Sequence, residues 1–317
     1  FMKTLKITCA EKGVLINKAF SFDFPVEYTE YEQLSQQQFY HQVRDQDVII
    51  ISDLKVDEQI LENNPNLKLL ALCSTGYDHV NVDLLKSKNV KICNIRGYAG
   101  DAVAEHAFIL MMNLIKNFGV QLNAVQSRAW SEGSVSFYLA APMRELNNKT
   151  LAILGKGEIG KALAEKAQAF GMNVIFSERK NAEKCREGYV PFEQAIQQAD
   201  ILSLHCELND ETRGMIDQNV LKQMKKDSIL INVGRGGLVN NQDVVQALKN
   251  NEIAGFGADV LDQEPPAQDH PLLNINHPNV MITAHIAWAT DEAQERLFSI
   301  IESNINQNIK GHSQNLI

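Results

Sequence analysis

The chain has 317 residues, which is enough for about two domains of ordinary size. With 44% hydrophobic and 22% charged residues, its composition excludes a largely disordered protein. The formal net charge of −9 argues against nucleic acid or an anionic membrane as a partner, but it leaves room for a small anionic substrate held by one local cation.

Short apolar runs alternate with longer amphipathic stretches. In chain order, strands are predicted at 5–8, 48–52, 69–73, 90–94, 151–154, 174–176, 201–204, 229–233, 255–260 and 280–283. Helices are predicted at 102–116, 159–170, 192–198, 219–224, 242–250 and 291–308. Several strand runs are wholly apolar, as in parallel strands buried on both faces. We therefore expect an α/β protein with two doubly wound domains, Rossmann-like and flavodoxin-like, whose parallel sheets face a cleft between them.

The five cysteines include no C-x-x-C pair, which predicts free thiols in a reducing cytoplasm. No apolar run approaches the roughly 18 residues of a membrane span, and no signal peptide is recognised. We expect a cytoplasmic protein without a membrane partner, and no residue is assigned to a metal.

A glycine-rich turn follows the strand at 151–154 and opens the next helix. Gly155 permits the tight turn, Gly157 lets the backbone approach a pyrophosphate, and Gly160 lets the helix pack against the strand. The helix N-terminus then presents free N–H groups to the phosphates. Because the motif lies between a strand and a helix and a second strand follows, it predicts a dinucleotide site.

Glu178 follows that second strand, 18 residues past Gly160. A carboxylate there is expected to bind the adenosine ribose hydroxyls and to repel the extra phosphate of NADP, so NAD is favoured over NADP. The neighbouring Ser177, Arg179 and Lys180 weaken this preference. The alternative is an ordinary surface glutamate.

Three residues follow later strands of the same array. Arg235 lies between glycines after the strand at 229–233, Glu264 follows the next strand, and His285 ends the last one. Carboxyl ends of parallel strands deliver ligand-binding residues to one edge of the sheet. Singly, each has an ordinary structural explanation. Of the other histidines, only His205 is expected to line the cofactor site.

Together the three residue types suit reduction of a 2-keto acid. Histidine transfers protons near neutral pH, so His285 would protonate the developing alkoxide. Glu264 would orient the ring and favour its protonated form. Arg235 would hold the substrate and stabilise charge on the carbonyl oxygen.

Over nearly its whole length the chain resembles the D-isomer-specific 2-hydroxyacid dehydrogenases. The matching blocks are Gly155–Gly160, Leu204–Cys206 with Thr212–Gly214, Asn232–Val239, Asp259–Pro266 and His285–Trp288. Within the family it is most similar to bacterial glycerate dehydrogenases, also called hydroxypyruvate reductases. The blocks behind this finer resemblance are Ser177–Lys180, Gly188–Phe192, Glu264–Pro266 with Asp269–Leu272, and His285–Trp288.

The resemblance implies a discontinuous substrate-binding domain, 1–99 with 287–317, an NAD-binding Rossmann domain at 100–286, closure of the cleft, and a homodimer formed largely through the cofactor domains. It implies a substrate site of Ser74, Thr75, Gly76, Arg235 and His285. The cofactor site it implies comprises Gly155, Gly157, Glu158, Ile159, Gly160, Glu178, Cys206, Glu207, Thr212, Val233, Gly234, Asp259, His285 and Ala287.

Three positions depart from the family pattern. The glycine turn carries Lys156 and Glu158, where relatives usually have an apolar residue and an arginine. Arg96 replaces a proline, and we expect its side chain to be solvated. Ser52–Leu54 stands where many relatives carry Asn-Lys or an aliphatic pair near the substrate pocket.

The leading hypothesis is therefore an NAD-dependent enzyme that interconverts hydroxypyruvate or glyoxylate with D-glycerate or glycolate. A second hypothesis keeps the chemistry and changes the 2-keto acid. A third, from another class, is a non-enzymatic NAD-sensing binding protein on the same fold, because such a protein could retain the glycine turn. The absence of appended interaction tails favours an enzyme.

Overall fold

The structure, a computed structural model, describes residues 3–317. It divides into two compact units, one made of residues up to 99 together with 289–317, and one made of residues 100–288. The sequence placed the second boundary two residues earlier, between 286 and 287. The roles given to these domains stay predictions.

The first unit contains a five-stranded parallel sheet in the order β2-β1-β3-β4-β5. Its strands are β1 (Leu5–Cys9), β2 (Val26–Glu30), β3 (Val48–Ile51), β4 (Leu69–Leu72) and β5 (Lys91–Cys93). Its helices are η1 (Lys12–Val14), α1 (Gln36–Gln42), α2 (Glu58–Asn63), α3 (Val82–Ser87) and α10 (Asp291–Ile309). β3 and β4 are wholly buried, as their apolar runs predict. This strand order is the flavodoxin-like one.

Several elements of this unit were not predicted. β2 is an edge strand whose residues are mostly exposed, so it lacks an apolar run. α1, α2 and α3 have only six or seven residues each, too few for a helical period to stand out.

The second unit contains a six-stranded parallel sheet in the order β11-β10-β9-β8-β6-β7. Its strands are β6 (Thr150–Leu154), β7 (Asn173–Ser177), β8 (Ile201–Leu204), β9 (Ile229–Asn232), β10 (Gly255–Ala258) and β11 (Val280–Ile282). A parallel bridge from Ser177 to Val190 extends the sheet beyond β7. With that bridge the order is that of a Rossmann fold, and the strand order reverses between β6 and β8. The predicted fold class, two doubly wound parallel sheets, is confirmed.

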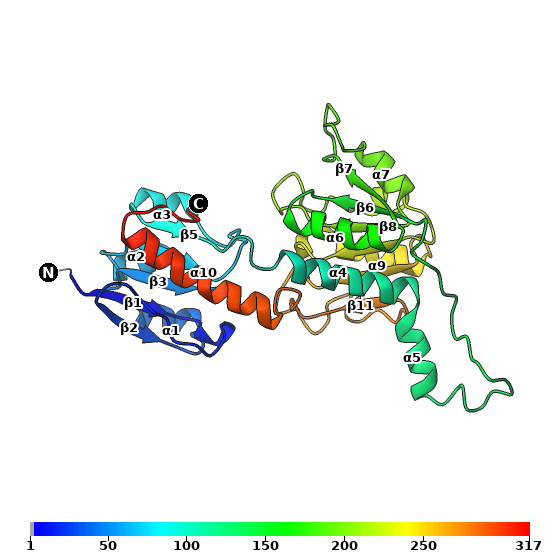
Figure 1. The fold of residues 1–317 in the computed structure, drawn as a ribbon, viewed down its shortest axis with the longest axis horizontal. Coiled ribbons are helices and arrows are strands. Elements are labelled where there is room, and N and C mark those ends of the chain that lie inside the picture. Colours follow the sequence, from blue (N-terminus) through cyan, green and yellow to red (C-terminus); the bar gives the residue numbers. More distant parts are fainter. Residues whose placement is uncertain (1–2) are drawn as a thin grey trace. The chain divides into compact units, whose positions relative to one another are not determined.

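The helices of the second unit are α4 (Gly100–Ile115), α5 (Phe118–Gln126), α6 (Glu158–Ala169), α7 (Phe192–Gln198), α8 (Gln218–Leu221), η2 (Gly236–Leu238) and α9 (Asn241–Lys249). α4 runs beside α6 and packs across β9, β10 and β11 (Figure 1). This packing buries about half of α4, whose sequence is apolar on nearly every face.

α5 and the segment 127–146 form an arm that leaves the body of the second unit (Figure 1). The returning chain is tied to the start of α5, where Asn117 donates to the Pro142 carbonyl and Gln121 to that of Ala141. In the described part of the chain, no single helix is long and apolar enough to cross a membrane. α4 and α5 pass such a test only as a pair, by length and composition, and they are bent by 64°.

Candidate active site

The glycine turn lies at the carboxyl end of β6, at the point where the strand order reverses. Gly155 has a φ of 109°, and a Cβ there would lie 2.5 Å from the His205 carbonyl oxygen at the end of β8. A Cβ on Gly160 would overlap the carbonyl oxygen of Gly155. A Cβ on Gly157 would meet nothing within 4 Å, so the turn is open on that side. Space for a pyrophosphate therefore lies at Gly157, beside the N-terminus of α6.

The two unusual residues of the turn point to different neighbours. The Lys156 ammonium lies 4.7 Å from the ring centre of Phe176 and 5.1 Å from that of Tyr189. The Glu158 carboxylate lies against Gly100, the first residue of α4. Because free N–H groups begin a helix, α4 offers Glu158 a favourable field. The negative charge of Glu158 is thus turned toward the start of α4.

Glu178 is buried, with 4% of its surface exposed, so the alternative of a surface glutamate is wrong. Its carboxylate accepts hydrogen bonds from the Arg186 guanidinium at 2.7 and 2.8 Å and from the amides of Arg179 and Arg186. These bonds, first among them those from the Arg186 side chain, lower the pKa of Glu178 to about 2. The structure therefore gives both carboxylate oxygens partners within the protein.

The segment after β8 borders the glycine turn. Burial lowers the pKa of His205 to about 4, so the ring is neutral, and its Nδ1 has no partner among residues 3–317. Cys206 follows, with a pKa raised to about 11 by burial. Thr212 fastens the loop by donating to the Glu207 carbonyl at 2.7 Å.

Arg235 stands after β9, in a short loop shaped by Asn232. The Asn232 side chain donates to the Arg235 carbonyl and accepts from the Gly234 amide. A Cβ on Gly236 would overlap the backbone of Leu261, so this loop touches the chain that leads to Glu264. Val233 is buried at the end of the strand.

Glu264 and His285 form a hydrogen-bonded pair. His285 Nδ1 lies 2.6 Å from Glu264 Oε2, and Glu264 Oε1 accepts from the Leu261 amide. The hydrogen bond to Glu264 raises the pKa of His285, against an opposing effect of burial. Burial would raise the pKa of Glu264, but bonds from His285 and Leu261 lower it below its ordinary value. The Arg235 charge lowers the pKa of both groups, and the loop that carries Arg235 contacts the backbone at Leu261, so Arg235 lies near the hydrogen-bonded pair.

Asp259 shapes the backbone around His285. Its buried carboxylate accepts from the amides of Ile286 at 2.9 Å and Ala287 at 2.8 Å, and its carbonyl accepts from the His285 amide. His285 itself has a left-handed φ of 54°, which is uncommon for a residue with a side chain. Thr283 donates to the same carboxylate at 2.6 Å. This set of bonds fixes the direction of the imidazole.

Ser74, Thr75 and Gly76 lie in the first unit, after β4. Ser74 donates its hydroxyl to the Gly76 carbonyl, and the Asn94 side chain donates to the carbonyl of Thr75. The amide N–H groups of Ser74–Gly76 donate no hydrogen bond within the described residues. Arg96 is exposed, as expected, and it also donates to Asn94 and to the Leu316 carbonyl.

Two contributors were missed by sequence reasoning. His106 on α4 lies 2.8 Å from Thr283 and 3.6 Å from Asp259, so it supports the backbone around His285. Arg186 pairs with Glu178 across eight residues of loop. Neither residue follows directly after a predicted strand, and position after a strand is what singled out Arg235, Glu264 and His285 in the sequence. The described residues hold no group of three or more His, Cys, Asp or Glu side chains arranged for a metal ion.

The chain is similar to known proteins both in sequence and in fold. The model of the D-isomer specific 2-hydroxyacid dehydrogenase, NAD binding domain, matches residues 108–287. A glycerate dehydrogenase of Methylorubrum extorquens is 33% identical over 315 residues, 99% of each chain. A hydroxypyruvate reductase of Blautia hydrogenotrophica is 32% identical over 87% of this chain and 86% of that protein. A solved acyclic imino acid reductase, in complex with NADPH and D-Arg, is 26% identical with a TM-score of 0.81, covering 99% of this chain and 100% of that one.

Proposed function

Because this chain belongs to the D-isomer specific 2-hydroxyacid dehydrogenase family, we propose that it interconverts hydroxypyruvate or glyoxylate with D-glycerate or glycolate. The observation that carries the proposal is the pairing of His285 with Glu264 within the electrostatic reach of Arg235. An enzyme that reduces a 2-keto acid needs a proton donor, an orienting carboxylate and a cation, and these are the three groups present.

We infer the following roles, which the hydrogen-bonded pair of Glu264 and His285 supports. A bound nicotinamide dinucleotide supplies the hydride. His285, whose pKa is raised, donates a proton from Nε2 to the carbonyl oxygen, because Nδ1 is engaged by Glu264. Arg235 binds the substrate and stabilises negative charge on that oxygen. The free amides of Ser74–Gly76 are assigned to the substrate carboxylate. In the opposite direction, neutral His285 takes the proton.

The residues of the glycine turn fit the dinucleotide. Gly157 leaves open space beside the start of α6, where backbone N–H groups favour phosphate oxygens. The orphaned Nδ1 of His205 adds a buried polar atom next to the turn. Val233, Gly234 and Asp259 are assigned to the nicotinamide end, and Cys206–Glu207 to the adenosine end.

We propose NAD as the preferred cofactor. Glu178 is ionised and stands at the end of β7, where a 2′-phosphate would meet a negative charge. Arg186 offsets part of that charge, and the imino acid reductase with this fold holds NADPH. The preference therefore depends on how Glu178 and Arg186 share the adenosine ribose.

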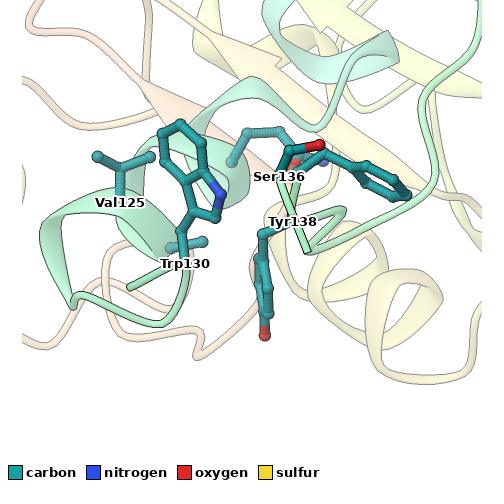
Figure 2. A pocket seen from close by; sticks show the side chains of 7 residues that line it. Val125, Trp130, Ser136 and Tyr138 are labelled. Carbon is teal, nitrogen blue, oxygen red and sulfur yellow. The ribbon is translucent and has the colours of Figure 1, made fainter. Parts of the chain in front are cut away.

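We propose a homodimer that buries the arm of the second unit. Large apolar side chains of this arm are exposed: Phe118, Leu122, Val125, Trp130, Val135, Phe137, Tyr138, Leu139 and Met143. Val125, Trp130 and Tyr138 help to line a hollow of about 260 Å³ in this arm. Figure 2 shows the side chain of Trp130 between those of Val125 and Tyr138. Exposed apolar surface of this extent is typical of a protein interface. A second copy of the chain is the proposed occupant.

A panel of 2-keto acids with NADH and NADPH tests the function, with hydride transfer followed at 340 nm as loss of reduced cofactor. We expect turnover of hydroxypyruvate and glyoxylate with NADH. His285→Ala should abolish turnover and leave NADH binding intact, whereas His312→Ala, at an exposed site, should change neither. If another 2-keto acid is preferred, the reaction stands and the substrate changes. If no acid is reduced while NADH binds, the protein is an NAD-sensing binder.

A further inference from the structure

Glu11 is a buried carboxylate that the proposed mechanism does not use. It lies two residues after β1 with 2% of its surface exposed. One carboxylate oxygen, Oε2, accepts from three consecutive amides, those of Ser52, Asp53 and Leu54, at 2.6, 3.0 and 3.2 Å. The other accepts from the Gln33 side chain at 3.2 Å.

Three successive amides that converge on one oxygen make an amide cradle, a concavity that binds anions. Here the cradle of Ser52–Leu54 is filled by a carboxylate of the same chain. It stands at the carboxyl end of β3, the edge of the sheet where open α/β folds bind ligands.

A second set of amides lies beside this cradle. β3 and β4 are neighbours, with Ile51 paired to Leu72, and the Cys73 amide donates to the Ile51 carbonyl at 2.8 Å. Neighbouring strands are about 4.8 Å apart, so the loops that follow them are adjacent. Unlike the amides of Ser52–Leu54, those of Ser74–Gly76 donate to no acceptor among the described residues.

We propose that Glu11 is a specificity-determining positioning residue that closes the Ser52–Leu54 cradle to a substrate carboxylate. This inference rests on the proposed function. Because Glu11 fills the Ser52–Leu54 cradle, only the amides of Ser74–Gly76 remain for the substrate carboxylate. A 2-keto acid therefore binds in one orientation. The filled cradle also excludes acids that carry a second carboxylate, since their second charge would meet Glu11 and the nearby Asp53 instead of free amides.

Glu11→Ala opens the cradle, and matched acids test the consequence. 2-Ketoglutarate and 2-ketovalerate share a five-carbon chain and differ in a terminal carboxylate. We expect the ratio of kcat/KM for the dicarboxylate over the monocarboxylate to rise roughly tenfold or more, because charge-assisted hydrogen bonds become available. Acetate should reverse this gain by filling the cradle. Glu11→Gln, which keeps an acceptor oxygen of the same size, should stay close to wild type.

Asp47→Ala is the matched control. The Asp47 carboxylate is as buried as that of Glu11, and it precedes β3, whereas the Ser52–Leu54 cradle follows β3. Asp47 accepts a hydrogen bond from the Lys6 amide and pairs with Lys68. Its loss should lower the melting temperature without changing the substrate ratio. An unchanged ratio in an active Glu11→Ala enzyme would overturn the proposal.

A binding readout does not depend on turnover. Acetate should raise the melting temperature of Glu11→Ala more than that of the wild type or of Asp47→Ala, with chloride at the same ionic strength as reference. If Glu11→Ala is recovered folded only when acetate is present, the cradle has been filled from solution, and the proposal is supported. If the wild type reduces no 2-keto acid, the proposed function fails, and the acetate effect alone decides whether the cradle binds carboxylates. If acetate raises the melting temperature of Glu11→Ala, Asp47→Ala and the wild type equally, the proposal is overturned.

Discussion

His285 holds its Nδ1 2.6 Å from Glu264 Oε2, and this bond sets both the direction and the charge of the imidazole. The carboxylate favours the protonated ring, so the pKa of His285 is raised. Reduction of a keto group needs the protonated ring, whereas oxidation of an alcohol needs the neutral one.

Replacing Glu264 by Gln should move the pH profile of reduction. In the wild type, kcat/KM for the keto acid falls as pH rises through the raised pKa of His285. Without the carboxylate that pKa falls, so the decline begins at lower pH, and at pH 8 kcat/KM should drop roughly 10- to 100-fold. Steady-state rates between pH 5 and 10 measure this. Glu193→Gln, at an exposed site on α7, is the control, and an unmoved profile would show that the pair does not set the proton donor.

Gly157 and Gly160 should respond differently to alanine. A Cβ on Gly157 meets nothing within 4 Å, so we expect unfolding free energy within about 0.5 kcal/mol of wild type and NADH affinity roughly tenfold weaker. A Cβ on Gly160 overlaps the Gly155 carbonyl, so the fold should lose about 1–3 kcal/mol.

Urea denaturation and NADH fluorescence titration separate these two effects. Gly119→Ala on α5, where a Cβ also meets nothing within 4 Å, should leave NADH affinity unchanged. Unaltered NADH affinity in Gly157→Ala would place the pyrophosphate elsewhere.

Glu178 and Arg186 should change cofactor preference in opposite directions. Glu178→Gln removes the negative charge and should lower the NADH-over-NADPH ratio of kcat/KM about tenfold, because like charges repel strongly when buried. Arg186→Leu leaves the carboxylate without its guanidinium and should raise the ratio. Steady-state kinetics of each single variant and of the double variant with NADH and with NADPH measure this ratio. Equal ratios in all four proteins would mean that the pair serves only to hold the loop 179–189.

The arm predicts the oligomeric state. Phe137→Asp combined with Leu139→Asp places charges on side chains that are 70% and 59% exposed. We expect the wild type to have twice the mass of one chain by light scattering at micromolar concentration, and the double variant to have the mass of one. Leu273→Asp, at an exposed apolar residue outside the arm, should remain dimeric. A wild-type monomer would refute the proposed interface.

Much of the fold could be predicted because buried parallel strands leave a strong pattern. β8 and α7 have the predicted bounds, and most other predicted strands and helices differ by one or two residues at an end. The meeting of Arg235, Glu264 and His285 was also predictable, since strand ends share one edge of the sheet.

The hydrogen bonds that hold the site residues in place could not be predicted, because they join segments that are distant in the sequence. His106 reaches Thr283 across 177 residues, and Glu11 reaches the Ser52 amide across 41. Glu178 was predicted as a ribose ligand, but its pairing with Arg186 depends on how a loop folds back. The exposure of the arm could not be predicted either, because its apolar residues look the same in the sequence as apolar residues that are buried.

The first unit is built from both ends of the chain. α10 packs against β4, Asn304 on α10 donates to the Asn94 carbonyl, and Leu316 bridges to Cys93. During synthesis, residues 100–288 leave the ribosome before the segment that completes this unit. Since domains generally fold as units during synthesis, the later-starting unit is expected to fold first. The β4 face that α10 covers is therefore expected to stay exposed until residues 289–317 have been made.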